Sequence, residues 1–267
     1  MASLIEKFLP FSIYNNLPHI RDVANAPNNH LEDLEDLRKL LAKHNVPKGV
    51  SIRLIHKHFD TQDGEIMTFD KLVLPTFGTV QTMKPIRPSN NHKLRGIHYF
   101  VNNTGSLQAY EYALFDVPDM SKFTSFLEEF SHLVIERNLQ HKFGLKLKVQ
   151  DELDRMSWTE FEFHQKRSTI MLQKGMPMPN GDFDYTVSTE WNAILADDDT
   201  KTCKHKTTCR HGNSTCNHCR HCANHDVEYN CSIDGDSLDA GFCLGGQRVT
   251  PGTPIFEVVN AIAVQAF

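Results

Sequence analysis

The chain has 267 residues, with 28 Lys and Arg against 33 Asp and Glu and a formal net charge of −5 when histidine is neutral. Hydrophobic residues make up 40% and charged residues 23%, which argues against wholesale disorder. A mildly acidic chain is also unfavourable for a protein whose main partner is duplex nucleic acid. No stretch approaches the roughly 18 apolar residues of a membrane span. The first residues lack the layout of a signal peptide. We therefore expect a cytoplasmic protein without a membrane partner, with a nuclear location left open.

In chain order, the pattern predicts few helices and many strands. After an irregular opening arm, leucines at three- and four-residue intervals from Leu31 to Leu41 predict an amphipathic helix. A second helix is predicted from Asp119 to Val134, with a phenylalanine-rich buried stripe. Strands are predicted at 52–59, 65–69, twice between 96 and 115, and at 142–150, 159–164, 168–173, 184–191 and 255–265. The fold class predicted is α+β, predominantly antiparallel β, as a barrel or a sheet.

Three domain segments are predicted from a change of composition at Asp197-Asp198-Asp199. Residues 1–199 form the main α+β domain, residues 200–231 a Cys/His-rich metal-binding insertion, and residues 232–267 the C-terminal strands that complete the main domain. The middle segment has almost no large apolar side chains, so it cannot form a hydrophobic core of its own.

The middle segment has the composition of a zinc site. No cysteine precedes Cys203, and ten cysteines and histidines then crowd into 23 positions. The ten are Cys203, Cys209, Cys216, Cys219, Cys222, His205, His211, His218, His221 and His225. Two overlapping CxxC steps let thiolates reach one ion, and tetrahedral Zn²⁺ needs four ligands, so one or two structural zinc sites are predicted.

Charge supports the zinc hypothesis for this segment. Residues 201–225 contain five Lys and Arg and neither Asp nor Glu, and nearby cations favour thiolate over thiol. Metal–ligand bonds would also replace the missing core. The alternatives are a disulfide-linked loop and a disordered tail of free thiols.

A second metal-site candidate is the pair His56 and His58. Two residues apart on the predicted strand, they share the face of Ile52 and Leu54, which points them inward. Neutral imidazole is the commonest nitrogen ligand of divalent metals. Glu65 follows across a turn, and whether it comes opposite His58 depends on the width of that turn. The alternative is a pair of hydrogen-bonded or surface histidines in an ordinary strand.

These residues resemble a known family. His56-x-His58, the following Glu65 and the later Gly96-Ile97-His98 stretch resemble the two motifs of the cupin superfamily, over residues 49–115. The resemblance implies a β-barrel in which His56, His58, Glu65 and His98 bind Fe²⁺, Mn²⁺ or Zn²⁺. Glu65 is displaced from the family's usual spacing.

Three functions follow from these patterns. The chain has no phosphate-binding glycine loop, nucleophile elbow or dinucleotide fingerprint. The first hypothesis is a metal-dependent enzyme, a cupin-like oxidoreductase or lyase acting on a small-molecule substrate, with a separate structural zinc module. The second is a non-enzymatic, zinc-stabilised protein that binds another protein or a nucleic acid. A nucleic acid is the less favoured partner, because no aromatic residue between Cys203 and Cys222 can stack on a base. The third is metal storage or delivery.

Overall fold

The computed structural model describes residues 3–74, 78–89, 92–148, 158–163, 166–173, 186–194, 225–233, 242–244, 247–249, 251–252, 256–257, 260–261 and 264. The opening arm contains a short strand and three four-residue helices: β1 (Leu4–Ile5), α1 (Phe11–Tyr14), α2 (Ile20–Val23) and α3 (Ala26–Asn29). None of the described helices is long and apolar enough to cross a membrane.

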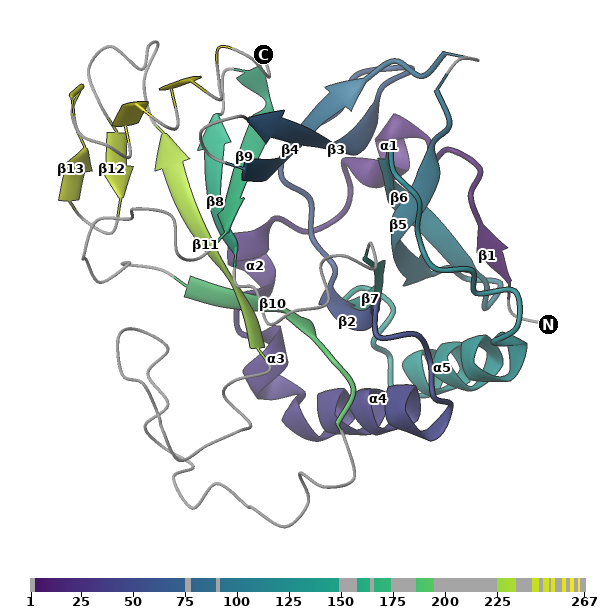
Figure 1. The fold of residues 1–267 in the computed structure, drawn as a ribbon. Helices are drawn as coiled ribbons and strands as arrows, with labels where there is room; N and C mark the ends of the chain where they lie inside the picture. The colour runs from purple at the N-terminus through teal and green to yellow at the C-terminus, as the bar shows by residue number, and fades with distance from the viewer. Residues whose placement is uncertain are drawn as a thin grey trace, which may run out of the picture.

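One large sheet dominates the fold. Its further strands are β2 (Val50–Leu54), β3 (Ile66–Leu74), β4 (Gly78–Ile86), β5 (Arg95–Val101), β6 (Leu107–Ala113), β7 (Phe143–Leu147), β8 (Trp158–Phe163), β9 (Ser168–Gln173), β10 (Thr186–Trp191) and β11 (His225–Ile233). The order is β1-β6-β3-β4-β9-β8-β11-β10-β2-β7-β5, and β5 pairs with β6 as well, so the sheet curls back on itself (Figure 1). Among the described strands of this sheet, only β1–β6, β3–β6 and β8–β11 pair in parallel. The predominantly antiparallel α+β fold is confirmed.

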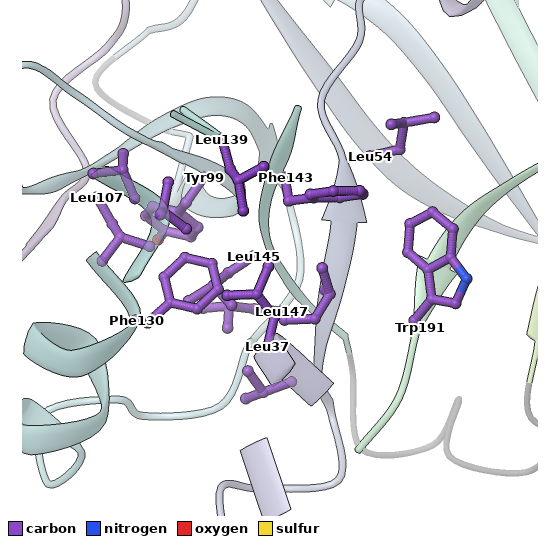
Figure 2. Close-up of a cluster of buried hydrophobic side chains, with 14 of the residues drawn as sticks. Leu37, Leu54, Tyr99, Leu107, Phe130, Leu139, Phe143, Leu145, Leu147 and Trp191 are labelled. Atoms are coloured by element: carbon purple, nitrogen blue, oxygen red, sulfur yellow. The ribbon is translucent and has the colours of Figure 1, made fainter. Parts of the chain in front are cut away.

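Two long helices cover one face of this sheet. They are α4 (Leu31–Lys43) and α5 (Thr124–Glu136), which lie side by side (Figure 1). Leu37 of α4 and Phe130 of α5 pack with Leu145 of β7 in the main hydrophobic core (Figure 2). Both predicted helices are confirmed. The second begins later than predicted, because the Asp119 carboxylate accepts hydrogen bonds from the backbone and hydroxyl of Ser121 in a turn before the helix.

Strand β2 divides the interior of the protein. Val50, Ile52 and Leu54 belong to the core that α4 and α5 cover. Side chains alternate along a strand, so Ser51 and Arg53 lie on the opposite face, which we call the inner face of the sheet. Both are buried nonetheless. The inner face therefore carries polar and charged groups inside the protein.

The N-terminal arm packs against a second, smaller core. Leu9, Tyr14 and Leu17 of the arm are buried together with Phe69 of β3 and Tyr110 of β6. The backbone N–H of Leu9 donates to the Tyr112 hydroxyl at 2.9 Å. The arm thus fixes Tyr14 beside the strands β3 and β6.

The strand predicted at 52–59 is shorter than expected and ends at Leu54. Beyond it the backbone finds partners outside the neighbouring strands: the N–H of Lys57 donates to the carbonyl of Pro18 in the arm at 2.9 Å. His56 and His58 therefore follow the strand instead of lying on it. His56 therefore lies beyond the strand whose alternation places Ile52 and Leu54 against the helices.

The C-terminal part also differs from the prediction. Residues 256, 257, 260, 261 and 264 are helical, although a strand was expected over 255–265; a short apolar run does not distinguish strand from helix by periodicity. β12 (Phe242–Leu244) and β13 (Gln247–Val249) form a separate two-stranded sheet. β11 begins at His225 and pairs with β8 and β10, so residues 225–231, expected in the insertion, belong to the large sheet.

Candidate functional site

Buried polar side chains gather where the inner face meets the N-terminal arm. We call this group the histidine centre; it consists of Tyr14, Arg53, His56, His58, His98 and Glu111. Each of the six is at most 4% exposed. Charged residues are seldom fully buried, because leaving water costs several kcal/mol per ion unless other groups compensate for it. A cluster of this kind is therefore a candidate for function.

The centre is built around a histidine–carboxylate pair. Nδ1 of His98 on β5 forms a short hydrogen bond with Oε2 of Glu111 on β6. The other carboxylate oxygen, Oε1, accepts a hydrogen bond from the Tyr14 hydroxyl at 3.0 Å. The pair is thus fixed from both ends. Among the described residues, however, Nε2 of the buried His98 ring has no hydrogen-bond partner.

Burial and nearby cations together determine the protonation of His98. Burial is the main cause that holds the pKa of His98 well below its ordinary value, followed by the positive charges of Arg53 and Lys146. The imidazole is therefore neutral, with Nδ1–H donating to the carboxylate and Nε2 left as the basic nitrogen.

Tyr14 is suited to hold the carboxylate. Burial, and then the charge of Glu111, raise the pKa of Tyr14 well above its ordinary value. Its hydroxyl therefore stays protonated and donates to Glu111. Because α1 carries Tyr14, the N-terminal arm contributes directly to the site.

His56 and His58 lie next to each other, with ring centroids 4.9 Å apart. Nδ1 of His56 lies 2.8 Å from the carbonyl oxygen of Leu54, which can only accept, so this nitrogen donates. Nε2 of His56 then accepts from the Arg53 guanidinium at 3.3 Å. The expected burial of both histidines is confirmed. His56 is therefore hydrogen-bonded at both ring nitrogens.

A second buried polar group adjoins the centre along the inner face. Oε2 of Glu190 pairs with Lys146 at 2.9 Å, and Oε1 pairs with Lys148 and accepts from the Ser51 hydroxyl at 2.6 Å. The Cα atoms of Glu190 and Arg53 are directly paired across β10 and β2. Polar residues therefore continue from the histidine centre across three neighbouring strands.

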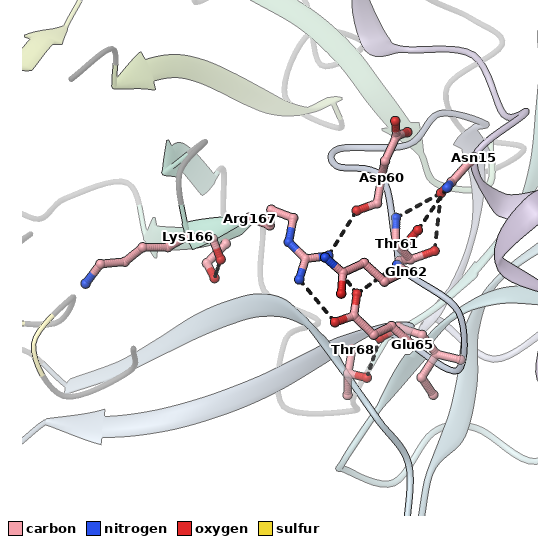
Figure 3. A network of polar contacts seen from close by, with 10 residues as sticks. Asn15, Asp60, Thr61, Gln62, Glu65, Thr68, Lys166 and Arg167 are labelled. Carbon is pink, nitrogen blue, oxygen red and sulfur yellow. Dashed lines mark hydrogen bonds and ion pairs between the residues drawn. The ribbon is translucent and has the colours of Figure 1, made fainter. Parts of the chain in front are cut away.

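Glu65 is engaged outside the histidine centre (Figure 3). Both of its carboxylate oxygens pair with the Arg167 guanidinium, at 2.6 and 3.1 Å. The hydrogen bond from Arg167 is the largest cause that lowers the pKa of Glu65. Arg167 also donates to the carbonyl of Asp60 at 3.3 Å, so this pair fastens the loop that leads from His58 to β3.

The ligand set implied by the cupin resemblance does not fit this arrangement as a whole. Glu65 is bound to Arg167, and Nε2 of His56 faces the cationic Arg53. Within the part of the chain that the structure describes, no group of three or more His, Cys, Asp and Glu side chains is placed to hold a metal ion. Of the expected ligands, His98 has a buried ring nitrogen without a partner among the described residues.

The predicted zinc ligands fall almost entirely elsewhere. Cys203, Cys209, Cys216, Cys219, Cys222, His205, His211, His218 and His221 lie outside the described residues. His225 is the first residue of β11, and its backbone pairs with that of Trp191.

Sequence reasoning found the histidines of the centre but missed Tyr14, Arg53 and Glu111. For Arg53 a signal existed, since Ser51 and Arg53 alternate with the apolar residues of a strand that was expected to be buried. Glu111 is a charged residue inside the apolar strand β6, which is unusual.

Comparisons of the chain with protein-family models, with curated proteins and with solved structures found no match. The class of the protein rests on its own geometry: an α+β protein whose curled, mostly antiparallel sheet encloses a buried histidine centre.

Proposed function

We propose that this protein is an enzyme that acts on a small molecule at the histidine centre, with Nε2 of His98 as general base. The observation that carries the proposal is the 0% exposed His98 ring, anchored through Nδ1 but without a hydrogen-bond partner at Nε2 among the described residues. An unmade hydrogen bond of a buried group costs about 1–3 kcal/mol. A functional role is one reason for a protein to retain such a group.

The chemistry follows from the pair of His98 and Glu111. Nε2 accepts a proton from a substrate hydroxyl or from water, and the Glu111 carboxylate stabilises the imidazolium that forms. Tyr14 holds the other oxygen of Glu111 and so keeps the ring in place. The lowered pKa keeps Nε2 unprotonated at neutral pH, so its lone pair can accept a hydrogen bond or a proton. In this proposal, the Arg53 guanidinium stabilises negative charge that develops on the substrate.

Metal dependence at the histidines stays a separate prediction. We propose to test it by elemental analysis of the purified protein and of a His56→Ala/His58→Ala variant. A divalent metal that is present in the wild type and lost in the variant would support the metal-dependent hypothesis. Equal metal content in both would count against it.

We further propose a structural zinc module at residues 203–225. It is supported by the ten cysteines and histidines, by the surrounding cations and by the lack of apolar side chains. The same composition supports the alternative function, a zinc-stabilised binding protein without catalysis.

The enzyme proposal is tested by comparing turnover in wild type and variants. A panel of small esters, hydroxy acids and phosphate monoesters is assayed with wild type, His98→Gln and the control His132→Gln, whose side chain is 80% exposed. Loss of general base catalysis lowers kcat by about 100-fold or more, so His98→Gln should lose turnover and His132→Gln should keep it. Turnover that survives in His98→Gln would refute the assignment of the base.

A further inference from the structure

We propose that the ligand of the histidine centre is a small oxyanion that carries its own O–H group, such as a hydroxycarboxylate or a monoprotonated phosphate. Its O–H donates to Nε2 of His98, and its negative charge lies near Arg53. This inference names the substrate class of the proposed function and therefore rests on it.

The first requirement on the ligand comes from the hydrogen-bonding character of His98. With Nδ1–H directed at Glu111, Nε2 is an acceptor. A ligand that offers only acceptors there, such as an ester carbonyl or an ionised carboxylate alone, would set lone pair against lone pair. A hydroxyl group supplies the missing donor, and its proton is the one that a general base removes.

The second requirement comes from charge. Arg53 is the cation that acts most strongly on His98, and Lys146, whose Cα is paired with that of His98 across β7 and β5, acts next. Lys146 is also paired with Glu190. A cationic substrate would meet repulsion from both residues at Nε2, whereas an anion would be attracted.

The orientation of Arg53 adds geometry to this argument. Its Nη1 donates to the Thr189 hydroxyl at 3.0 Å and its Nη2 to His56 at 3.3 Å, so the planar guanidinium is fixed on the inner face. A pre-oriented guanidinium recognises carboxylate and phosphate better than a flexible ammonium does. The aromatic rings of Phe69 and Tyr110 lie beside His98, with centroids 5.2 and 5.8 Å away, so they flank the imidazole on its apolar sides.

The experiment is isothermal titration calorimetry of the full chain at pH 7 with four probes. Glycolate and inorganic phosphate combine an anion with an O–H group, acetate has the anion alone, and ethylene glycol has the hydroxyl alone. We expect glycolate or phosphate to bind, and acetate and ethylene glycol to bind at least about tenfold more weakly, because each lacks one of two charge-assisted or buried hydrogen bonds. Preference for glycolate or for phosphate identifies the source of the oxyanion.

Variants locate the binding. Arg53→Gln should weaken the preferred probe at least about tenfold, while the control Arg137→Gln, in a surface ion pair between α5 and α4, should bind as the wild type does. Circular dichroism checks the fold of each variant. If Arg53→Gln does not fold, the affinity of Arg53→Lys and the four-probe comparison with the wild type still test the inference. Equal binding of acetate or ethylene glycol, no binding of either glycolate or phosphate, or unchanged affinity in a folded Arg53 variant overturns the inference.

The outcomes separate this inference from the proposed function. Turnover of a neutral substrate that is lost in His98→Gln, without anion binding, rejects the inference and leaves the enzyme proposal standing. Anion binding that depends on Arg53, together with no turnover in the substrate panel, supports the inference and counts against the enzyme proposal.

Discussion

The sharpest prediction concerns the acid sensitivity that His98 gives to the fold. In the unfolded chain His98 titrates near its ordinary pKa of about 6.5, whereas in the folded protein burial, Arg53 and Lys146 hold its pKa well below that value. Between these two pKa values the unfolded state binds one proton more than the folded state. The free energy of unfolding therefore falls as the pH decreases through this window, by about 1.4 kcal/mol per pH unit.

The sign of this effect follows from the direction of the pKa shift. The contribution of His98 to stability is fully present above its unfolded pKa and is lost as the pH falls from there toward the folded pKa. The slope depends only on the difference in bound protons, and the width of the window depends on how far burial and the cations lower the pKa of folded His98. The assay is urea unfolding at half-unit steps between pH 7.5 and roughly pH 5, a window that follows from the reference pKa.

The comparison of variants isolates His98 from other titrating groups. His98→Gln should lose this part of the pH dependence, and its curve should converge with that of the wild type as the pH falls. The control His132→Gln, with an 80% exposed side chain, should run parallel to the wild type. Parallel curves for wild type and His98→Gln would refute the claim that the folded protein keeps His98 neutral.

Three further predictions test the surroundings of the centre. Tyr14→Phe removes the buried hydrogen bond to the Glu111 carboxylate and should lower the free energy of unfolding in urea by about 1.5–3 kcal/mol, because hydrogen bonds to charged groups are the stronger ones; a loss below about 0.5 kcal/mol would contradict this bond. Arg167→Ala should lower stability by about 1 kcal/mol at pH 7, and this difference should shrink as the pH falls below the ordinary Glu pKa of about 4.3 and toward the lower pKa of folded Glu65; a difference independent of pH would contradict the ion pair. Elemental analysis should find about one or two zinc ions per chain and fewer in Cys216→Ser; unchanged zinc would contradict the zinc module.

Periodicity predicted the elements whose packing is local. The leucine spacing from Leu31 to Leu41 indicated α4, because one face of that helix is buried and the other is not. The alternation of residue types in β2 did not predict that its polar face is buried, because both faces of the strand lie inside the protein. Ile52 and Leu54 face the helices, while Arg53, on the opposite face, contacts His56. The burial of His56 was predicted correctly, but its face was wrong.

The partner of His98 was beyond prediction from spacing. Counting back from the pair Val101 and Leu107 in a regular hairpin would place Tyr110 opposite His98. A register shift between His98 and Tyr99 instead brings Glu111 opposite His98. Such irregularities re-aim single side chains, and they depend on tertiary packing. The His98–Glu111 pair therefore became evident only in the folded structure.

¹⁵N NMR of the imidazole nitrogens at pH 7 reports the protonation of His98 directly, with the His98 signals assigned by their loss in His98→Gln. We expect a neutral His98 ring with the proton on Nδ1 and an unprotonated Nε2. A proton on Nε2 in the neutral ring, or a doubly protonated imidazolium, would contradict it.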